Sequence, residues 1–251
     1  MSLLLTGAGG PASGFTPASL NPAAWYDAHT GPEWQLAART TPAVVDADPV
    51  GAWDDASANA RHALQSTNLS FRPSLRLAVQ NGRSVVRFDG IDDSLNVPSL
   101  PASSYTVYRV FRVRSLPGVG GLAISGNQAA GAYLYMGIEN AGGTIRSYNV
   151  VGTGQGLAYA YPFVAGGVYL SVLHGTDAGT WKHRINGVQN GSVAALAFAN
   201  PLSVYRLGGG AIGQGLYCPW DFCAEIIYPA AHTLLQLEQV EGYLNARWGV
   251  Y

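Results

Sequence analysis

The sequence predicts an all-β fold in which two antiparallel sheets pack as a sandwich, with one amphipathic helix at the C-terminal end. Short β-prone runs recur at spacings of about 8–12 residues with turn signals between them, which is the pattern of a sandwich. Glycine (32 residues) and proline (14 residues) are plentiful, as expected of many strands joined by turns. At 251 residues, the chain can bury a substantial core as one large domain.

The strongest strand signal lies at residues 105–113, which read Tyr-Thr-Val-Tyr-Arg-Val-Phe-Arg-Val. Apolar residues occur on both faces of this run, so it is expected in the middle of a two-layer structure. Asn186-Gly187 predicts a hairpin turn. The other predicted strands are residues 25–28, 85–88, 94–97, 121–125, 132–139, 144–151, 168–174, 181–186, 204–207 and 222–228.

Residues 84–95 predict a strand, a tight acidic turn and the start of a second strand. The first run is β-prone (Val-Val-Arg-Phe), and Asp89-Gly90 follows it. The Asp89 side chain can accept bonds from backbone amides just ahead of it, and Gly90 can adopt a positive φ without a Cβ penalty. The second run ends at Pro98.

One helix is predicted near the C-terminus. Thr233 and Gln236 match a Thr-x-x-Gln capping box, and Gly249 lies where a C-terminal cap belongs. Between them, apolar residues at spacings of three, four and four form one stripe: Leu237, Val240, Leu244 and Trp248.

Charge is unusually scarce in this chain. Only 12% of the residues are charged, against a usual ~25%, the net charge is −1, and Lys182 is the only lysine. No basic patch is dense enough for nucleic acid. A surface this poor in charge fits a protein that partners cover, because charge helps to keep free monomers apart.

Cysteine usage and the N-terminus bear on the compartment. Cys218 and Cys223 leave two alternatives, a local disulfide or two buried free thiols, and the thiols are favoured because nothing indicates an oxidising compartment. The N-terminus lacks the basic region of a signal peptide, and no apolar run approaches the ~18–20 residues of a transmembrane helix. We therefore expect synthesis in the cytoplasm, with any export by another route.

Two segments are expected. Residues 1–22 form a Gly/Pro-rich arm that contains almost no charge, whereas disordered tails usually carry charge. We expect the arm to be ordered by docking on its own domain or on a neighbouring subunit. The candidate docking residues are Leu3, Leu4, Leu5 and Phe15. Residues 23–251 form the single folded domain.

Three stretches carry a family resemblance. They are residues 24–28 together with 53–59, Arg72-Pro73 together with 85–95, and residues 224–228 together with 237–249. Their order and spacing resemble those of concanavalin A-like, laminin-G-type jelly-roll domains of bacterial and phage proteins, although Ala58 replaces the expected glycine. The resemblance implies a two-sheet jelly roll but fixes no function, since this fold hosts lectins, hydrolases and structural modules.

The arm resembles a second group of proteins. Met-Ser-Leu-Leu-Leu-Thr-Gly-Ala-Gly-Gly, followed by a Gly/Pro-rich stretch, is similar to the start of tail-region and virion proteins of bacteriophages and prophages. Such proteins are assembled in the host cytoplasm and released by lysis, which agrees with the absent signal peptide and the charge-poor composition.

Two acidic groups are candidates for a calcium site, although no cofactor is required by the sequence. They are Asp89, Asp92 and Asp93, and Asp54, Asp55 and Asn59. The favoured alternative is that these side chains hold turns by accepting backbone hydrogen bonds.

The sequence argues against an enzyme. Hydrolases on this fold present their paired acids from one strand as Glu-x-Asp-x-x-Glu, whereas Glu225 stands alone on its predicted strand. No Gly-x-Ser-x-Gly nucleophile elbow and no phosphate-binding loop occurs.

Aromatic residues in or near loops are the candidates for sugar binding, because their ring faces can stack on pyranose rings. The alternative is that they fill the core or an inter-subunit contact. The candidates are Tyr133, Tyr135, Tyr148, Tyr159, Tyr161, Tyr217 and Trp220.

The leading hypothesis from the sequence is a non-enzymatic bacteriophage virion protein, a tail, fibre or capsid-decoration component. The arm would bind other virion proteins, copies of the chain would associate, and exposed loops are candidates for contact with host surface glycans. Neither nucleic acid nor a membrane is an expected partner. The alternative is a carbohydrate-binding lectin or adhesin module, and a more distant one is a glycan-cleaving enzyme.

Overall fold

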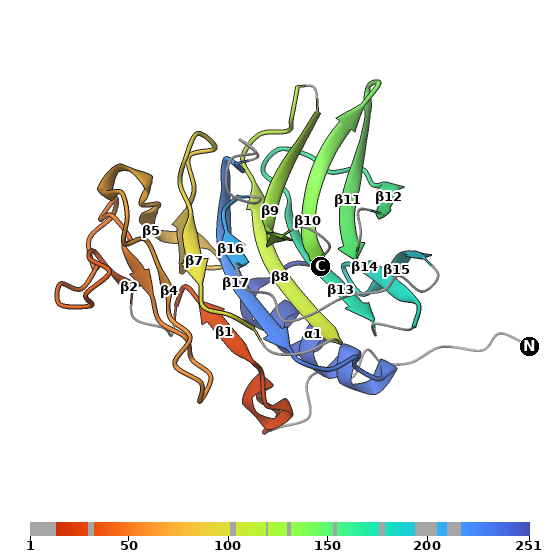
Figure 1. Ribbon diagram of the computed structural model, residues 1–251, viewed down its shortest axis with the longest axis horizontal. Helices are drawn as coiled ribbons and strands as arrows, with labels where there is room; N and C mark the ends of the chain where they lie inside the picture. Colours follow the sequence, from red (N-terminus) through yellow and green to blue (C-terminus); the bar gives the residue numbers. More distant parts are fainter. Residues whose placement is uncertain are drawn as a thin grey trace, which may run out of the picture.

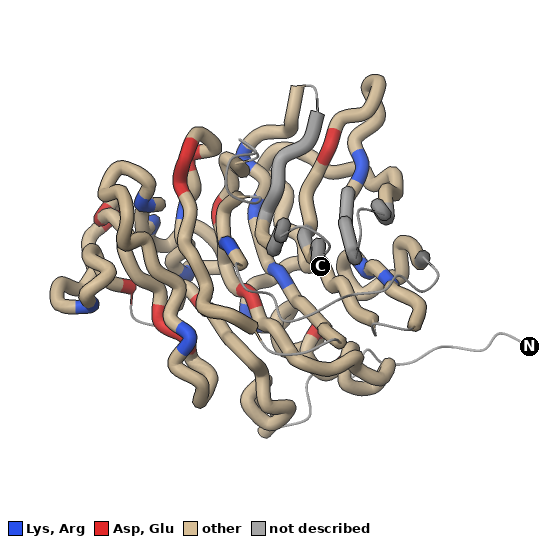
Figure 2. The backbone as a smooth tube through the Cα atoms, in the orientation of Figure 1, with Lys and Arg blue, Asp and Glu red and all other residues tan. Residues whose placement is uncertain are grey.

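The computed structural model describes residues 14–29, 33–100, 104–118, 120–129, 132–152, 155–175, 179–193, 205–209 and 217–251. Within these ranges, no helix has the length and hydropathy needed to cross a membrane. Figure 2 shows the acidic and basic residues dispersed along the backbone of the described part of the chain.

Two antiparallel sheets form a sandwich, as the sequence predicted (Figure 1). The first follows the order β15-β14-β13-β8-β17-β6-β5, and β1 pairs with β17 beside this path. Its strands are β1 (Ala24–Asp27), β5 (Ser74–Gln80), β6 (Arg83–Arg87), β8 (Tyr105–Val113), β13 (Val168–Gly175), β14 (Trp181–Ile185), β15 (Val188–Val193) and β17 (Trp220–Tyr228).

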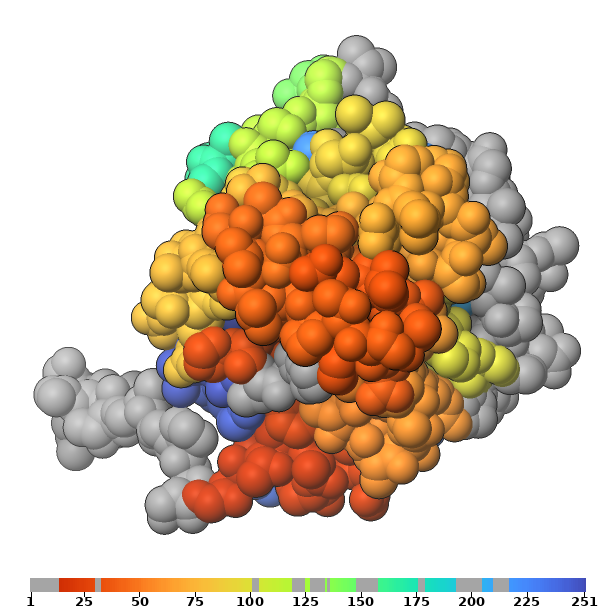
Figure 3. All heavy atoms as spheres, turned by 90° about the vertical axis from the view of Figure 1, so that its left-hand side faces the viewer, coloured from red at the N-terminus to blue at the C-terminus, as the bar shows by residue number. Residues whose placement is uncertain are grey.

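The second sheet follows the order β12-β11-β10-β9-β16-β7-β4-β3-β2. Its strands are β2 (Glu33–Trp34), β3 (Ala52–Trp53), β4 (Ala63–Leu64), β7 (Leu95–Val97), β9 (Gly120–Ala129), β10 (Ala132–Ala141), β11 (Thr144–Gly152), β12 (Gln155–Ala160) and β16 (Tyr205–Leu207). Two short 3₁₀ helices, η1 (Pro17–Leu20) and η2 (Leu69–Phe71), and one α-helix, α1 (Leu234–Trp248), complete the described elements. Figure 3 shows the end of the sandwich covered largely by the red-to-yellow first part of the chain.

Strand β8 is central, as predicted from its two apolar faces. It pairs along its length with β13 on one side and β17 on the other, and only Arg112 of its nine residues is not fully buried. Phe111 stacks on Trp220 with ring centroids 5.7 Å apart, inside a core rich in large aromatic side chains. Replacing such a buried ring by alanine typically costs about 3–5 kcal/mol.

A polar network crosses the core between the sheets. Arg109 of β8 and Glu225 of β17 are both fully buried, with 3.6 Å between Arg109 Nε and Glu225 Oε2. Arg109 also donates to Ser125 Oγ (2.5 Å) and to the Tyr205 hydroxyl (3.0 Å), and Tyr205 donates to Glu225. Burial raises the pKa of Glu225, while the Arg109 charge opposes that shift. Because these bonds join both sheets, the network fixes how the sheets align.

The acidic turn at residues 89–93 differs from a hairpin. The strands on its two sides exist, but β6 belongs to the first sheet and β7 to the second, so the turn carries the chain across the sandwich. Gly90 has φ +86°, and a Cβ there would lie 2.7 Å from Pro219 Cβ. The turn therefore packs too closely on Pro219 for any residue but glycine.

The predicted helix and both of its caps are confirmed. Thr233 and Gln236 form the capping box, and Gly249 caps the C-terminus with φ +61°. The apolar stripe is buried, and two ion pairs add to its docking: Arg184 of β14 with Glu241 (2.8 Å), and Arg247 with Asp27 of β1 (2.6 Å). The helix is thus fixed to the first sheet near both its middle and its end.

The hairpin turn at Asn186-Gly187 is also confirmed, with φ values of +50° and +77° between paired strands β14 and β15. Several strands had no usable sequence signal. Strands β2, β3 and β4 have two residues each, too few for a period to show, and β15 reads Val-Gln-Asn-Gly-Ser-Val.

The described end of the arm packs on its own domain. Phe15 is half-buried against the core, Pro17 is buried, and its carbonyl accepts a hydrogen bond from the Tyr228 hydroxyl (3.0 Å). Leu3, Leu4 and Leu5 lie outside the described residues, so their docking role and the domain division at residues 22 and 23 stay predictions. Cys218 and Cys223 are two buried free thiols, the favoured alternative.

Candidate functional site

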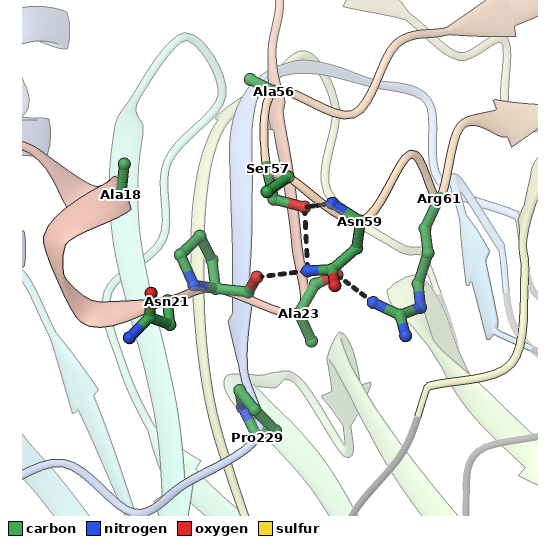
Figure 4. A pocket seen from close by; sticks show the side chains of 10 residues that line it. Ala18, Asn21, Ala23, Ala56, Ser57, Asn59, Arg61 and Pro229 are labelled. Atoms are coloured by element: carbon green, nitrogen blue, oxygen red, sulfur yellow. Dashed lines mark hydrogen bonds between the residues drawn. The ribbon is translucent and has the colours of Figure 1, made fainter.

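One pocket with a cavity volume of about 300 Å³ lies beside the start of β1. Helix η1, the start of β1 and the loop after β3 form its wall, together with Pro229, which follows β17 (Figure 4). The lining combines small apolar residues with four larger polar ones: Ala18, Pro22, Ala23, Ala56, Ala58 and Pro229, with Asn21, Ser57, Asn59 and Arg61.

Asp55 shapes the loop that lines this pocket. Its Oδ1 accepts hydrogen bonds from the backbone amides of Trp25 and Ser57, both at 2.8 Å. Its Oδ2 accepts from the Ser57 hydroxyl (2.7 Å) and the Arg61 amide (2.8 Å). Both carboxylate oxygens are therefore engaged in holding the loop against β1.

Asn59 and Arg61 tie the loop to the segment before β1. Asn59 Nδ2 donates to the carbonyls of Pro22 (2.9 Å) and Ala23 (3.2 Å), and Arg61 Nη1 donates to the Ala23 carbonyl (2.8 Å). Asn21 ends η1 in the left-handed conformation (φ +51°) and is exposed. Among the described residues, neither Asn59 Oδ1 nor the Asn21 side-chain amide has a hydrogen-bond partner, so both are available to a ligand.

The calcium candidates in this region, Asp54, Asp55 and Asn59, already form hydrogen bonds and ion pairs within the protein. Asp54 accepts bonds from Arg39 Nη2 (2.8 Å) and Trp34 Nε1 (3.1 Å) and lies 3.0 Å from His62 Nδ1. Asp55 and Asn59 hold the pocket loop as described. For this set, the observed bonds favour the turn-holding interpretation.

Asp89, Asp92 and Asp93 do lie together, each with a carboxylate oxygen within 4.8 Å of the others. Asp89 Oδ1 accepts from the Ile91 amide (2.8 Å), and Asp93 Oδ2 accepts from the Asp89 amide (2.8 Å). Burial and the neighbouring Asp89 charge raise the pKa of Asp93 to about 7. The backbone bonds account for the grouping as a braced turn, and the residue types also suit a hard cation.

The aromatic candidates separate into four groups. Trp220 is fully buried and donates to the Ser115 carbonyl (2.8 Å), so this candidate is a core residue and presents no ring to a ligand. Tyr159 bridges strands β12 and β15 by donating to the Ser192 carbonyl (2.7 Å). Tyr161 and Tyr217 are half-buried. The side chains of Tyr133, Tyr135 and Tyr148 lie outside the described part of the structure.

Tyr161 is the outer member of an aromatic cluster. Its ring centroid lies 4.8 Å from that of Phe163 and 5.8 Å from that of Tyr169. Burial raises the pKa of Tyr161. Phe163 and Tyr169 hold the ring and are themselves part of the core, so the role of Tyr161 as a stacking surface stays a prediction.

Most described carboxylates serve the fold. Asp221 is fully buried and receives two bonds from Arg87, at 2.6 and 2.9 Å. Other acid–arginine ion pairs are Asp46–Arg76, Asp54–Arg39, Glu139–Arg146, Glu225–Arg109, Glu241–Arg184 and Asp27–Arg247. These carboxylates therefore form ion pairs with arginines of the fold.

Sequence reasoning did not single out Asn21, Ser57 or Arg61 as ligand-binding residues. The pocket joins residues 18–23, 56–61 and 229, whose spacing gives no periodic signal. The only available indication was the cluster of short polar residues at 54–59, which favours side chain-to-backbone turns.

No family model and no curated protein matches the sequence. The sandwich is shared with solved structures of low identity. The ligand-binding domain of botulinum neurotoxin serotype D, solved with N-acetylneuraminic acid, is 12% identical with a TM-score of 0.63, covering 93% of this chain and 55% of that one. The binding domain of paraclostridial mosquitocidal protein 1 is 13% identical with a TM-score of 0.58, covering 77% and 50%.

Trypanosoma rangeli sialidase, solved with 2,3-difluoro-KDN, is 11% identical with a TM-score of 0.61, covering 94% of this chain and 36% of that one. The chain thus spans about half the length of the toxin domains and about a third of the sialidase. At these identities, the likeness shows the fold: a lectin-like jelly-roll β-sandwich, as the sequence predicted.

Proposed function

We propose that the chain is a non-enzymatic, lectin-like domain that binds a glycan in the pocket between η1 and the 56–61 loop. The volume of about 300 Å³ is at the small end of the ~300–1,000 Å³ range of ligand sites and suits a single sugar ring. Alanine and proline walls suit the C–H faces of a sugar, and Asn21 and Asn59 offer amide groups to its hydroxyls. The botulinum neurotoxin serotype D ligand-binding domain, which shares this fold, was solved in complex with N-acetylneuraminic acid, and this supports the assignment.

One observation carries the non-enzymatic part of the proposal: the residues that line the pocket include no carboxylate. Glycoside hydrolysis requires two carboxyl groups, about 5–5.5 Å or about 6.5–9.5 Å apart, on either side of the bond that breaks. Asp55, which lies behind the pocket loop, uses both oxygens to hold that loop. The pocket is therefore equipped to hold a sugar and not to cleave one.

The proposed setting is a bacteriophage virion, with the arm contacting other virion proteins and copies of the chain associating. The arm sequence and the low content of charged residues, 12%, support this setting. Mass spectrometry of purified particles tests it. Detection at a fixed stoichiometry is expected, and absence from the particle would remove the virion role without affecting the pocket.

A glycan array probed with the purified chain tests binding, and Asn21→Ala supplies the site-specific comparison. We expect binding to a subset of glycans and a several-fold loss in Asn21→Ala, because the exposed amide is removed without disturbing a bond within the protein. Glu238→Gln on the exposed face of α1 is the matched control and should bind normally. Release of sugar from any bound glycan would contradict the non-enzymatic proposal.

A further inference from the structure

The chain contains three Asn-Gly pairs, at residues 81–82, 186–187 and 190–191. Asparagine before glycine is prone to deamidation, because a glycine has no Cβ to hinder attack by its backbone nitrogen. This nitrogen bonds to the side-chain carbonyl carbon, the bond from that carbon to Nδ2 breaks, and ammonia leaves with the backbone amide proton. Water then opens the cyclic imide to aspartate or isoaspartate. The ranking of the three pairs depends on their surroundings in the fold.

The 81–82 pair is the most open of the three. It forms the turn between β5 and β6, with φ +49° at Asn81 and +69° at Gly82, and both residues are exposed. A Cβ placed on Gly82 would meet no atom within 4 Å. Among the described residues, neither the Gly82 amide nor Asn81 Oδ1 has a hydrogen-bond partner. The attacking nitrogen and the oxygen that gains charge are thus both accessible to water.

The other two pairs are held by contacts of the first sheet. Asn186 Oδ1 accepts a backbone amide of β13 at 2.9 Å, and a Cβ added to Gly187 would lie 3.0 Å from the Tyr251 hydroxyl oxygen. Gly191 lies within β15, where an added Cβ would be 1.9 Å from the Tyr159 ring. Attack at either pair therefore requires these contacts to break.

Arg83 supplies a positive charge beside the Asn81 amide. Asn81 Nδ2 and Arg83 Nε both donate to the Arg247 carbonyl oxygen at 2.9 Å, so the two nitrogens are at most twice that distance apart. Among the described residues, no acid forms an ion pair with Arg83. Attack by the Gly82 nitrogen places negative charge on Asn81 Oδ1, and a neighbouring cation stabilises that charge.

We infer that Asn81 is a site of spontaneous deamidation, that the Arg83 charge promotes the reaction, and that the product loosens the C-terminal end of α1. The product has a carboxylate oxygen in place of the Nδ2 donor, so it cannot donate to the Arg247 carbonyl and competes with it for Arg83. It also adds negative charge at the negative end of the helix dipole. Gln80 Nε2 still donates to the Trp248 carbonyl at 2.7 Å, so only a part of the cap is lost.

Peptide mapping by mass spectrometry tests the site, with the folded chain incubated at mildly alkaline pH. Conversion at Asn81 should be at least several-fold faster than at Asn186 and Asn190. Arg83→Gln should slow conversion at Asn81 several-fold, the size expected of an exposed charge a few Å away, and Arg83→Lys should keep a part of the effect. Arg112→Gln is the control, because Arg112 donates to the Gly166 carbonyl instead.

Hydrogen exchange tests the consequence. Amides at the C-terminal end of α1, including Gly249, which donates to the Asn245 carbonyl, should exchange several-fold faster in Asn81→Asp than in wild type. Asn68→Asp is the matched control, because this exposed amide-to-acid change keeps the oxygen that accepts the Ser70 amide.

Each part of the inference has an outcome that would overturn it. Conversion at Asn81 that is absent, or no faster than at the other two pairs, would overturn the site. An unchanged or faster rate in Arg83→Gln would overturn the role of Arg83. Exchange in Asn81→Asp equal to that of wild type would overturn the effect on α1.

Discussion

Replacing Glu33 with glutamine is expected to stabilise the protein, with the largest effect at alkaline pH. Glu33 lies on the edge strand β2 with only 8% of its surface exposed, and its Oε1 has no hydrogen-bond partner among the described residues. Burial, with smaller contributions from the Asp27 and Asp54 charges, raises the pKa of Glu33 from 4.5 to about 9. The folded state therefore holds a proton that the unfolded chain releases at neutral pH.

The sign and the size follow from this difference in proton binding. Between pH 4.5 and about 9, the folded state binds more protons than the unfolded state, so stability falls as the pH rises. From about pH 5 to about pH 8, the loss attributable to Glu33 is at most about 4 kcal/mol, at about 1.4 kcal/mol for each unit of pKa difference. Glutamine has nearly the same shape as the protonated acid but cannot ionise, so the variant should lack this loss.

Urea unfolding of both proteins at about pH 5 and about pH 8 measures the effect. The difference in unfolding free energy between variant and wild type should grow with pH, and titration of all other groups cancels in that difference. Glu238→Gln, on the exposed face of α1, should show no such growth. Parallel stability curves for Glu33→Gln and wild type would refute the argument, because they would mean that Glu33 ionises alike in both states.

Three further outcomes are expected. Gly191→Ala should lower the free energy of unfolding by about 1–3 kcal/mol in the same urea assay, because the added Cβ would lie 1.9 Å from the Tyr159 ring. Tyr159→Phe only removes the hydrogen bond to the Ser192 carbonyl, so it should lower the free energy of unfolding by less. Burial lowers the pKa of His183 from 6.5 to about 3, so the stability linked to this residue is present above pH 6.5 and lost on acidification. In a plot of unfolding free energy against pH, His183→Gln should therefore reduce the fall between pH 6.5 and about 3. An unchanged fall would contradict the assignment. Calcium should leave the melting temperature unchanged relative to chelator if the turn at Asp93 is held by backbone bonds alone, and a rise that Asp93→Asn abolishes would establish a cation site.

Much of the fold could be predicted where local chemistry and tertiary structure agree. The run at 105–113 is apolar on both faces, which only a central strand can satisfy, and β8 has those bounds. The capping box at Thr233 and the glycine at 249 mark helix ends through backbone groups a few residues apart, so they are readable without any knowledge of the fold. The Asn186-Gly187 turn is local for the same reason.

The candidate site could not be predicted in this way. Arg61 resembles any other arginine in the sequence, and it lines the pocket only because residues 18–23, 56–61 and 229 come together in the fold. Trp220 illustrates the opposite case. A tryptophan near a loop is a reasonable stacking candidate, but its place beside Phe111 decided that it fills the core.

The amino-acid sequence by itself determined the class of fold, the central strand, the helix with its caps and the turn chemistry at Asp89-Gly90, because each depends on interactions between near neighbours. Tertiary structure alone decided that this turn crosses between the sheets and that Glu225 forms an ion pair with Arg109 inside the core. It also decided that Arg61, beside the pocket, has no acidic partner among the described residues. These outcomes depend on contacts between segments distant in the chain, and no local spacing records such contacts.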